Sequence, residues 1–356
     1  MFPERLGVTM ERRAGKCQQE VLFLGASSQV GFKHLEREKG PLLHSGMIRG
    51  GVILTLTFLF VALIPFIGPI VVILTPLPIL YYCSRLGRRR GLAVLIVSFL
   101  ATYGILGLLE HGTNLPALSM IGFAGVLLSE VLKRNLSVEK TFLLASLAFF
   151  CCGAGFVLYQ AFLAGITPWR ILELYVAGIV RENIKLYAQL NISEEQVRLI
   201  RESAPQITHL FTGIFPALAL SGAVFTVWVN LLAGRLLFRR NGVAFPDFGD
   251  LAAWKAPERL VWILIAAGGM VIVPVERVTI VGMNLLILCG LIYMFQGLAI
   301  AAFFFREKRV PMIFRWLFYA LLLVQQYMLI IVIVFGLFDM WADFRKRIGG
   351  VKNAPV

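Results

Sequence analysis

Long apolar runs limit what this chain can fold into more than any other feature. Hydrophobic residues make up 58% of the 356-residue sequence and charged residues only 15%, against about 25% charged in soluble domains. A helix of about 20 residues crosses the hydrocarbon layer of a membrane once. We therefore expect an all-α, polytopic transmembrane helical bundle, with single spans over residues 91–109, 115–132, 141–165, 207–234, 257–275 and 280–304.

Two further apolar stretches, 51–84 and 311–342, are too long for one untilted crossing. Proline removes an amide donor and clashes with the preceding turn, so Pro65 and Pro69 predict a helical hairpin that turns near Gly68. The second stretch has only Gln325 and Gln326 as polar residues near its middle and is compatible with one tilted helix or two short ones. We expect about 8 to 10 crossings overall, and the assignment that fits best has eight up to residue 304 and one or two after it.

The distribution of basic residues predicts the topology. Most of the 34 Lys and Arg fall in alternate loops and before the first span, and cytoplasmic loops accumulate these residues. We therefore expect a cytoplasmic N-terminus. The same bias explains the formal charge of +14 without a nucleic-acid partner. Arg345, Lys346 and Arg347 would also be cytoplasmic if 311–342 re-enters, which favours a final hairpin.

The chain divides into five regions by composition. Residues 1–46 form a polar tail without a signal-peptide pattern; the alternatives are a disordered tail or a gene-model extension ahead of Met47. An N-terminal membrane bundle (47–165) precedes an extracytoplasmic amphipathic segment (166–206), a C-terminal membrane region (207–347) and a tail (348–356).

Within the extracytoplasmic segment, apolar residues recur at helical spacing from 168 to 190, which predicts an amphipathic helix that either forms a lid or simply packs at the membrane surface. Ser193 and Gln196 have capping-box spacing and predict a second helix. Pro205 is the expected start of the next span.

Polar side chains inside apolar spans are the strongest indication of function, because burying them in lipid is costly. Asn230, Asn284 and Gln296 are the candidate ligand-binding residues. The alternative for Asn284 and Gln296 is an interhelical hydrogen bond.

Motifs for catalysis and for cofactor binding are missing from the sequence. It has no G-x-x-x-x-G-K-[ST] phosphate loop and no H-E-x-x-H zinc pair, and its four histidines are scattered. The five cysteines are odd in number and have no metal or redox spacing. We expect no enzyme activity, no metal and no cofactor.

Trp254, Pro257 and Glu258 predict an interfacial turn that leads into a helix, because aromatic rings prefer the headgroup level and proline suits a first helical turn. Membrane anchoring explains this turn. Docking of a cytoplasmic protein partner through Trp254 to Arg259 is the alternative.

Four segments resemble the YybS-like family of uncharacterised bacterial membrane proteins, over roughly residues 47 to 347. They are Leu63 to Ile79, Trp254 to Trp262, Asn284 to Ala299, and the closing Gly336 to Arg345, with Asp339, Asp343 and Arg345. The early helices are similar to the substrate-binding subunits of energy-coupling-factor vitamin transporters, although the Ala-x-x-x-Ala docking pair is missing.

This resemblance implies a multi-pass protein of the bacterial cytoplasmic membrane that binds a solute or takes part in transport, in contact with lipid and with a cytoplasmic or transmembrane protein partner. The alternative is a membrane scaffold or envelope regulator that binds a cytoplasmic partner through Trp254 to Arg259 or Asp339 to Arg347.

Overall fold

The computed structural model describes residues 45–64, 68–110, 115–134, 136–189, 193–243, 245–246 and 248–349. All regular elements in these ranges are helices, which confirms the all-α prediction. The predicted N-terminal tail lies almost entirely outside the described residues, as do the last seven residues of the chain. The chain forms two compact units, Met1–Leu115 and Pro116–Val356.

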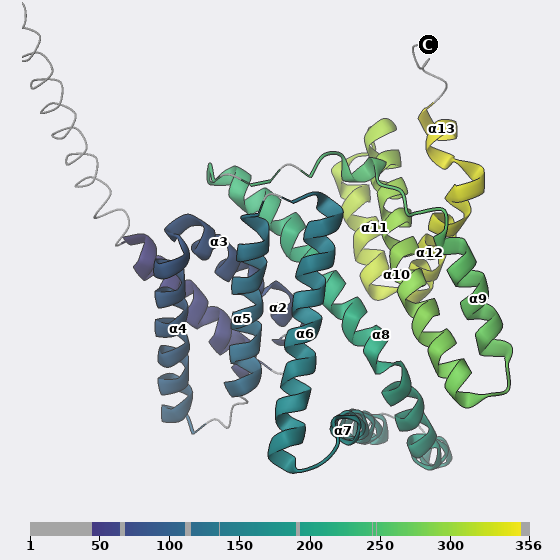
Figure 1. Ribbon diagram of the computed structural model, residues 1–356, viewed down its shortest axis with the longest axis horizontal. Helices are drawn as coiled ribbons and strands as arrows, with labels where there is room; N and C mark the ends of the chain where they lie inside the picture. Colours follow the sequence, from purple (N-terminus) through teal and green to yellow (C-terminus); the bar gives the residue numbers. More distant parts are fainter. Residues whose placement is uncertain are drawn as a thin grey trace, which may run out of the picture. The chain divides into compact units, whose positions relative to one another are not determined.

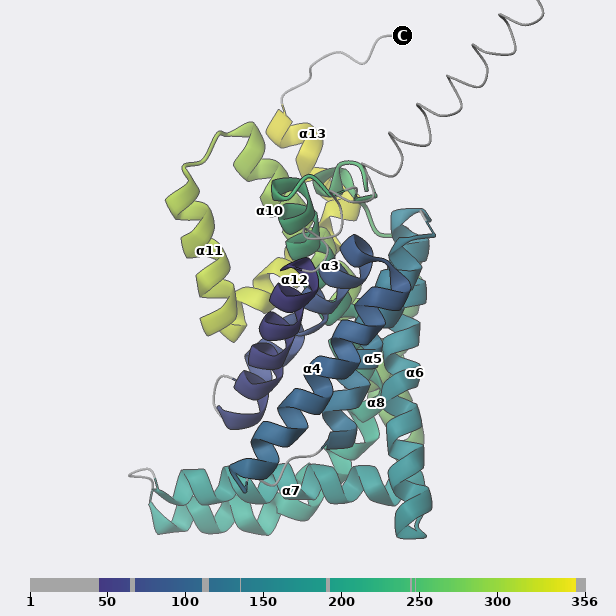
Figure 2. The same ribbon diagram turned by 90° about the vertical axis from the view of Figure 1, so that its left-hand side faces the viewer.

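In the first unit, a helix over Ser45–Leu63 is followed by α2 (Gly68–Leu74), α3 (Pro76–Leu86) and α4 (Arg88–Leu108). A Cβ on Gly46 would meet Leu86, and a Cβ on Gly50 would meet the ring of Tyr82, so the first helix runs antiparallel to α3. This arrangement confirms the predicted hairpin. The tip, residues 65–67, lies outside the described residues. Ser98 of α4 donates a hydrogen bond to the Gly51 carbonyl at 3.1 Å, and Figure 2 shows this first helix in purple beside α4.

The second unit begins with α5 (Leu115–Leu132, whose first residue belongs to the first unit), α6 (Val138–Ala164), α7 (Pro168–Gln189) and α8 (Glu194–Arg240). The amphipathic helix expected over 168–190 is α7. It lies beside the first part of α8 and across the direction of α6 (Figures 1 and 2). Three of its apolar residues are buried: Ile171, Val176 and Ile184.

The expectation that a new helix starts at Pro205 is wrong, because α8 continues through Pro205 and Pro216 for 47 residues. A proline removes one amide donor from the ladder and tends to bend a helix, but the hydrogen bonds on either side of it can keep the helix continuous. The predicted cap is present at the start of this helix, where Ser193 Oγ accepts a hydrogen bond from the Gln196 amide at 3.3 Å.

The rest of the second unit comprises a 3₁₀ turn, η1 (Leu251–Ala253), and five helices. These are α9 (Leu260–Ile272), α10 (Glu276–Glu307), α11 (Met312–Val324), α12 (Gln326–Ala342) and α13 (Phe344–Gly349). The stretch 311–342 is therefore two helices, and their axes bend by 109° at the glutamine pair.

Helix α10 approaches α12 closely enough for backbone contact. A Cβ on Gly297 would overlap the Val332 carbonyl, and one on Gly336 would overlap the Tyr293 carbonyl. Such small residues let helix backbones meet in a membrane, where packing rather than the hydrophobic effect holds helices together. The two glycines therefore fix α12 along α10.

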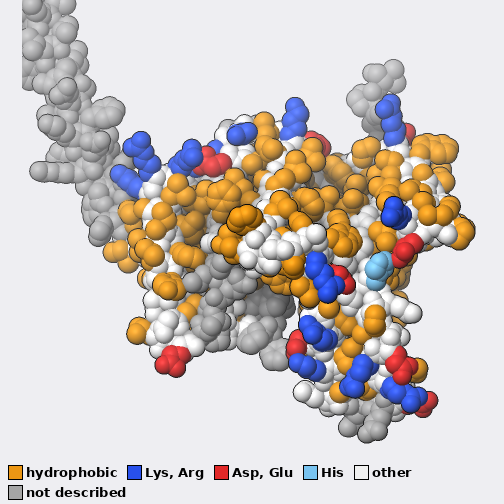
Figure 3. Space-filling view, turned by 60° about the horizontal axis from the view of Figure 1, so that its bottom comes forward, with side chains coloured by type: hydrophobic (Ala, Val, Ile, Leu, Met, Phe, Trp, Pro, Cys, Tyr) orange, Lys and Arg blue, Asp and Glu red, His pale blue; other side chains and the backbone are white. Residues whose placement is uncertain are grey.

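Within the part of the chain that the structure describes, five helices are long and apolar enough to cross a membrane: Ser45–Leu63, Arg88–Leu108, Val138–Ala164, Glu195–Arg240 and Glu276–Glu307. The α11–α12 pair would make a sixth if it were one span, and Val71–Leu86, Leu118–Leu132 and Leu260–Ile272 are shorter apolar helices. Figure 3 shows hydrophobic side chains over much of the helices, and charged ones gathered over α7 and the start of α8. The count of 8 to 10 crossings and the cytoplasmic N-terminus stay predictions.

We expect Gly297→Ala to lower the free energy of unfolding by about 1–3 kcal/mol, because the added methyl must push α12 away from α10. Gly290→Ala on the same helix is the matched control, since a Cβ there would have its nearest neighbour at 4.0 Å. Thermal unfolding of the purified protein in detergent measures both. Equal losses in the two variants would contradict the close contact.

Candidate functional site

Buried polar groups gather at the end of α10 that is followed by α11, around Asp339 of α12. Its Oδ2 accepts a hydrogen bond from Gln296 Nε2 at 3.1 Å, and its Oδ1 accepts one from the Phe344 amide at 2.9 Å. Arg345 Nη1 lies 3.6 Å from Oδ2. Asp339 is 2% exposed and Arg345 8% exposed, so each charge is held in place by its buried partner. We call Gln296, Asp339 and Arg345 the Asp339 cluster.

The Asp339 cluster also holds the loop that precedes α9. Gln296 Oε1 accepts a hydrogen bond from the Ala256 amide at 3.2 Å, and Arg345 Nη2 donates to the Trp254 carbonyl at 2.7 Å. Burial lowers the pKa of Arg345, while the neighbouring carboxylate of Asp339 opposes that shift. The cluster thus joins α10, α12, α13 and this loop through one buried carboxylate.

Exposed ion pairs surround the Asp339 cluster. Asp343 lies 2.7 Å from Lys346 and 3.0 Å from Lys255, and hydrogen bonds from these two ammonium groups hold the pKa of Asp343 below its usual value. Asp250 lies 2.8 Å from Arg306, whose hydrogen bond likewise lowers the pKa of Asp250. The loop is therefore tied both to the end of α10 and to the residue that follows α12.

Asn284 of α10 bonds to two backbone groups of α8 on either side of Pro216. Its Oδ1 accepts a hydrogen bond from the Ala217 amide at 3.0 Å, and its Nδ2 donates to the Gly213 carbonyl at 2.9 Å. In a regular helix these two backbone groups would bond to each other. Pro216 lies within this turn and supplies no amide of its own to the ladder, and the side-chain amide of Asn284 is bonded to both groups. We call this arrangement the Asn284 bridge.

The three candidate ligand-binding residues take part in separate hydrogen-bond networks. Asn230 of α8 is fully buried, and its Nδ2 donates to the Thr226 carbonyl at 2.7 Å. Asn284 and Gln296 are separated by about 18 Å along α10, given a rise of 1.5 Å per residue. Both engage their oxygen and nitrogen in bonds to the protein, so the interhelical alternative describes their contacts. A role in ligand binding stays a prediction for all three.

The predicted partner-docking residues differ in their exposure. Trp254 is half-buried and its carbonyl is bonded to Arg345. Pro257 and Glu258 are exposed just before α9. Asp339 and Arg345 are buried in the Asp339 cluster, which leaves Asp343 as the accessible acid of the closing motif.

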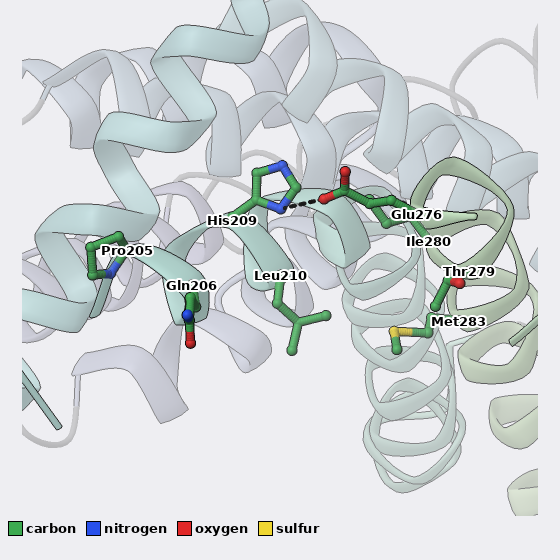
Figure 4. A pocket seen from close by; sticks show the side chains of 8 residues that line it. All are labelled: Pro205, Gln206, His209, Leu210, Glu276, Thr279, Ile280 and Met283. Atoms are coloured by element: carbon green, nitrogen blue, oxygen red, sulfur yellow. Dashed lines mark ion pairs between the residues drawn. The ribbon is translucent and has the colours of Figure 1, made fainter. Parts of the chain in front are cut away.

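A cavity of about 510 Å³ opens between α8 and α10, on the side of the Asn284 bridge toward α7. Figure 4 shows His209 and Glu276 facing each other across it, with Nδ1 3.3 Å from Oε1. Its lining combines polar and apolar side chains: Pro205, Gln206, His209, Leu210, Glu276, Thr279, Ile280 and Met283. We call it the α8–α10 pocket.

Sequence reasoning missed this pocket. Its eight lining residues come from two segments that are far apart in the chain, and none of them was a candidate. Two prolines close together in one apolar helix, with a histidine between them, were the available signal. Within the described residues, no group of three or more His, Cys, Asp or Glu could hold a metal ion.

We expect Asn284→Ala to cost about 1–3 kcal/mol of unfolding free energy, because it leaves a buried amide and a buried carbonyl unpaired. In a Pro216→Ala background the cost should shrink, since the helix can then straighten and the two groups can bond to each other. A double-mutant cycle from detergent unfolding curves measures the difference. A cost that is the same in both backgrounds would contradict the Asn284 bridge.

Asp339→Ala should cost about 3–5 kcal/mol, the usual range when one partner of a buried ion pair is removed. Asp250→Ala is the control: it breaks an exposed pair with Arg306 and should cost no more than about 1 kcal/mol. Melting temperatures of the two purified variants give the comparison. Equal melting temperatures of the two variants would contradict a stabilising role of the Asp339 cluster.

Comparison with known proteins places the chain in a family. The protein "Uncharacterized protein YybS" of Bacillus subtilis is 21% identical over 314 residues, which cover 85% of this chain and 98% of the relative. No solved structure matches the chain, and neither sequence match shows the similarity to energy-coupling-factor subunits. The family described as "Predicted membrane protein (DUF2232)" matches residues 52–340. The resemblance noted in the sequence is thereby confirmed, and this chain belongs to the DUF2232 family of membrane proteins.

Proposed function

We propose that this protein is a solute-binding component of the bacterial cytoplasmic membrane and that the solute occupies the α8–α10 pocket. The observation that supports the proposal best is the pocket itself. Its volume of about 510 Å³ falls within the range of small-molecule sites, which is about 300–1,000 Å³. The site binds without performing chemistry on its ligand.

The position of the pocket agrees with a site that is reached from outside the cell. It lies where α8 leaves α7, and the topology predicted from basic residues places α7 on the extracytoplasmic face. Transporter sites commonly lie beside interrupted helices whose backbone groups are satisfied by neighbouring helices. Helix α8 is continuous, but Pro205 and Pro216 each remove one amide donor from it beside the pocket, and the Asn284 bridge contacts its backbone there.

The lining of the pocket indicates the class of solute. Gln206, His209, Glu276 and Thr279 offer hydrogen-bonding groups, while Leu210, Ile280 and Met283 offer apolar contact. His209 and Glu276 are both largely exposed, so a ligand can reach them from the mouth. A small amphipathic molecule with a polar head and an apolar body satisfies both parts of the lining.

A scaffold that docks a cytoplasmic partner has less support from the contacts. Trp254, Asp339, Asp343 and Arg345, four of the six residues expected to dock it, are bonded within the chain. A partner would have to bind the exposed positions Pro257 and Glu258 instead.

A thermal-shift screen of the purified full chain tests the proposal with vitamins, nucleobases and amino acids as probes. A solute that binds only the folded protein raises its melting temperature in a saturable way. We expect His209→Ala to weaken binding at least about tenfold, which corresponds to the loss of roughly 1.4 kcal/mol of contact energy. The unliganded protein should melt as before, because an exposed ion pair contributes little.

Lys185→Ala is the matched control for this experiment. It removes the exposed 2.8 Å pair with Glu182 on α7, away from the pocket, and should leave ligand binding unchanged. A saturable shift that His209→Ala and Lys185→Ala affect equally would place the ligand elsewhere. The absence of any shift across the library, together with capture of a cytoplasmic protein, would favour the scaffold.

A further inference from the structure

The α11–α12 pair leaves and re-enters the same side of the second unit. Arg306, before α11, is paired with Asp250 of the loop that precedes α9. Arg345, after α12, donates a hydrogen bond to the Trp254 carbonyl of that loop. Because one loop contacts both ends, the 109° bend between the helices returns the chain to the surface it left.

The bend lies within the apolar layer if the loop is at the membrane surface. Helix α11 has 13 residues and α12 has 14 residues from Gln326 to Asp339, so each arm is about 20 Å long and reaches less deep than the roughly 30 Å of hydrocarbon. Leu323 and Val324 just before the bend are 83% and 77% exposed, and α11 has no buried residue. Such a surface is suited to lipid or to another protein.

The bend itself carries polar groups that lipid does not satisfy. Gln325 leaves the helical conformation, with φ −106° and ψ 98°. Its amide still donates to the Leu321 carbonyl at 2.7 Å and its carbonyl accepts from the Met328 amide at 3.0 Å, but the other end groups of the two helices have no regular intrahelical partner at such a break. The side chains of Gln325 and Gln326 are exposed and make no hydrogen bond within the described residues. Non-helical backbone at membrane depth persists only where protein or water covers it.

We propose that a second copy of this chain covers the bend, with Gln325 and Gln326 of the two copies hydrogen-bonded across a two-fold axis. A glutamine amide contains a donor and an acceptor, so the same pair opposite itself satisfies both. In an isologous contact each residue meets its own surface patch. The exposed apolar side chains of Leu323, Val324 and Tyr327 form the rim of this contact. The contact contains no ion pair.

Co-purification tests this contact. Two differently tagged copies of the full chain are expressed together and reconstituted in nanodiscs of phosphatidylethanolamine and phosphatidylglycerol. We expect the wild-type copies to be captured together and the Gln325→Leu/Gln326→Leu variant to associate at least about tenfold more weakly, a change of about 1.4 kcal/mol. Ile272→Ala, which removes exposed apolar surface at the end of α9 and lies outside the proposed contact, is the control and should still pair.

A disulfide test reports on the contact directly. Gln325→Cys, in a background with Cys17, Cys151 and Cys152 replaced by serine, should form a dimer under oxidation, because a disulfide needs Cα atoms within about 7 Å. Ile272→Cys at the exposed end of α9 should not. The proposal fails if wild-type chains are monomeric in nanodiscs, if the leucine variant pairs as tightly as wild type, or if the Gln325→Cys variant gives no cross-link. In those cases lipid, water or another protein covers the bend.

Discussion

Hydrocarbon provides no hydrogen-bond partner, and this constraint accounts for the contacts that hold the second unit together. Where Pro216 disturbs the ladder of α8, a side chain of α10 supplies the missing donor and acceptor. Where α12 ends, Asp339 accepts the amide of Phe344 and pairs with a buried arginine. At these two places the irregular backbone lies where neighbouring side chains bond to it.

Helix α10 is the element on which these contacts converge. One turn of it holds the Asn284 bridge to α8, another presents Gly297 to the backbone of α12, and the residue before that glycine joins the Asp339 cluster. The glycine and the glutamine act together, because close approach of the two backbones brings the glutamine amide within reach of a carboxylate on α12. Packing and polar contacts therefore favour the same register of α12 along α10.

The helices and their approximate limits could be predicted from sequence, because apolar length and proline position are local properties. The hairpin that turns near Gly68 and the amphipathic helix over 168–190 are of this kind. For 311–342 the sequence left one tilted helix or two short ones open, and the structure has two. The continuity of α8 through Pro205 could not be predicted, since a proline within a helix and one at a helix start look the same in sequence. The hydrogen-bond partners of the polar side chains could not be predicted either. Nothing near Asn284 in the sequence points to Pro216, and the residues of the α8–α10 pocket meet only in the folded chain.

The Asn284 bridge restricts how α8 and α10 can move. Two hydrogen bonds fix the side chain of one helix to a single turn of the other, so sliding by one turn would leave the proline-disturbed groups without a partner. Rotation about that point keeps both bonds. The bridge thus sets the register of the two helices at one point, and the α8–α10 pocket beside His209 lies next to that point.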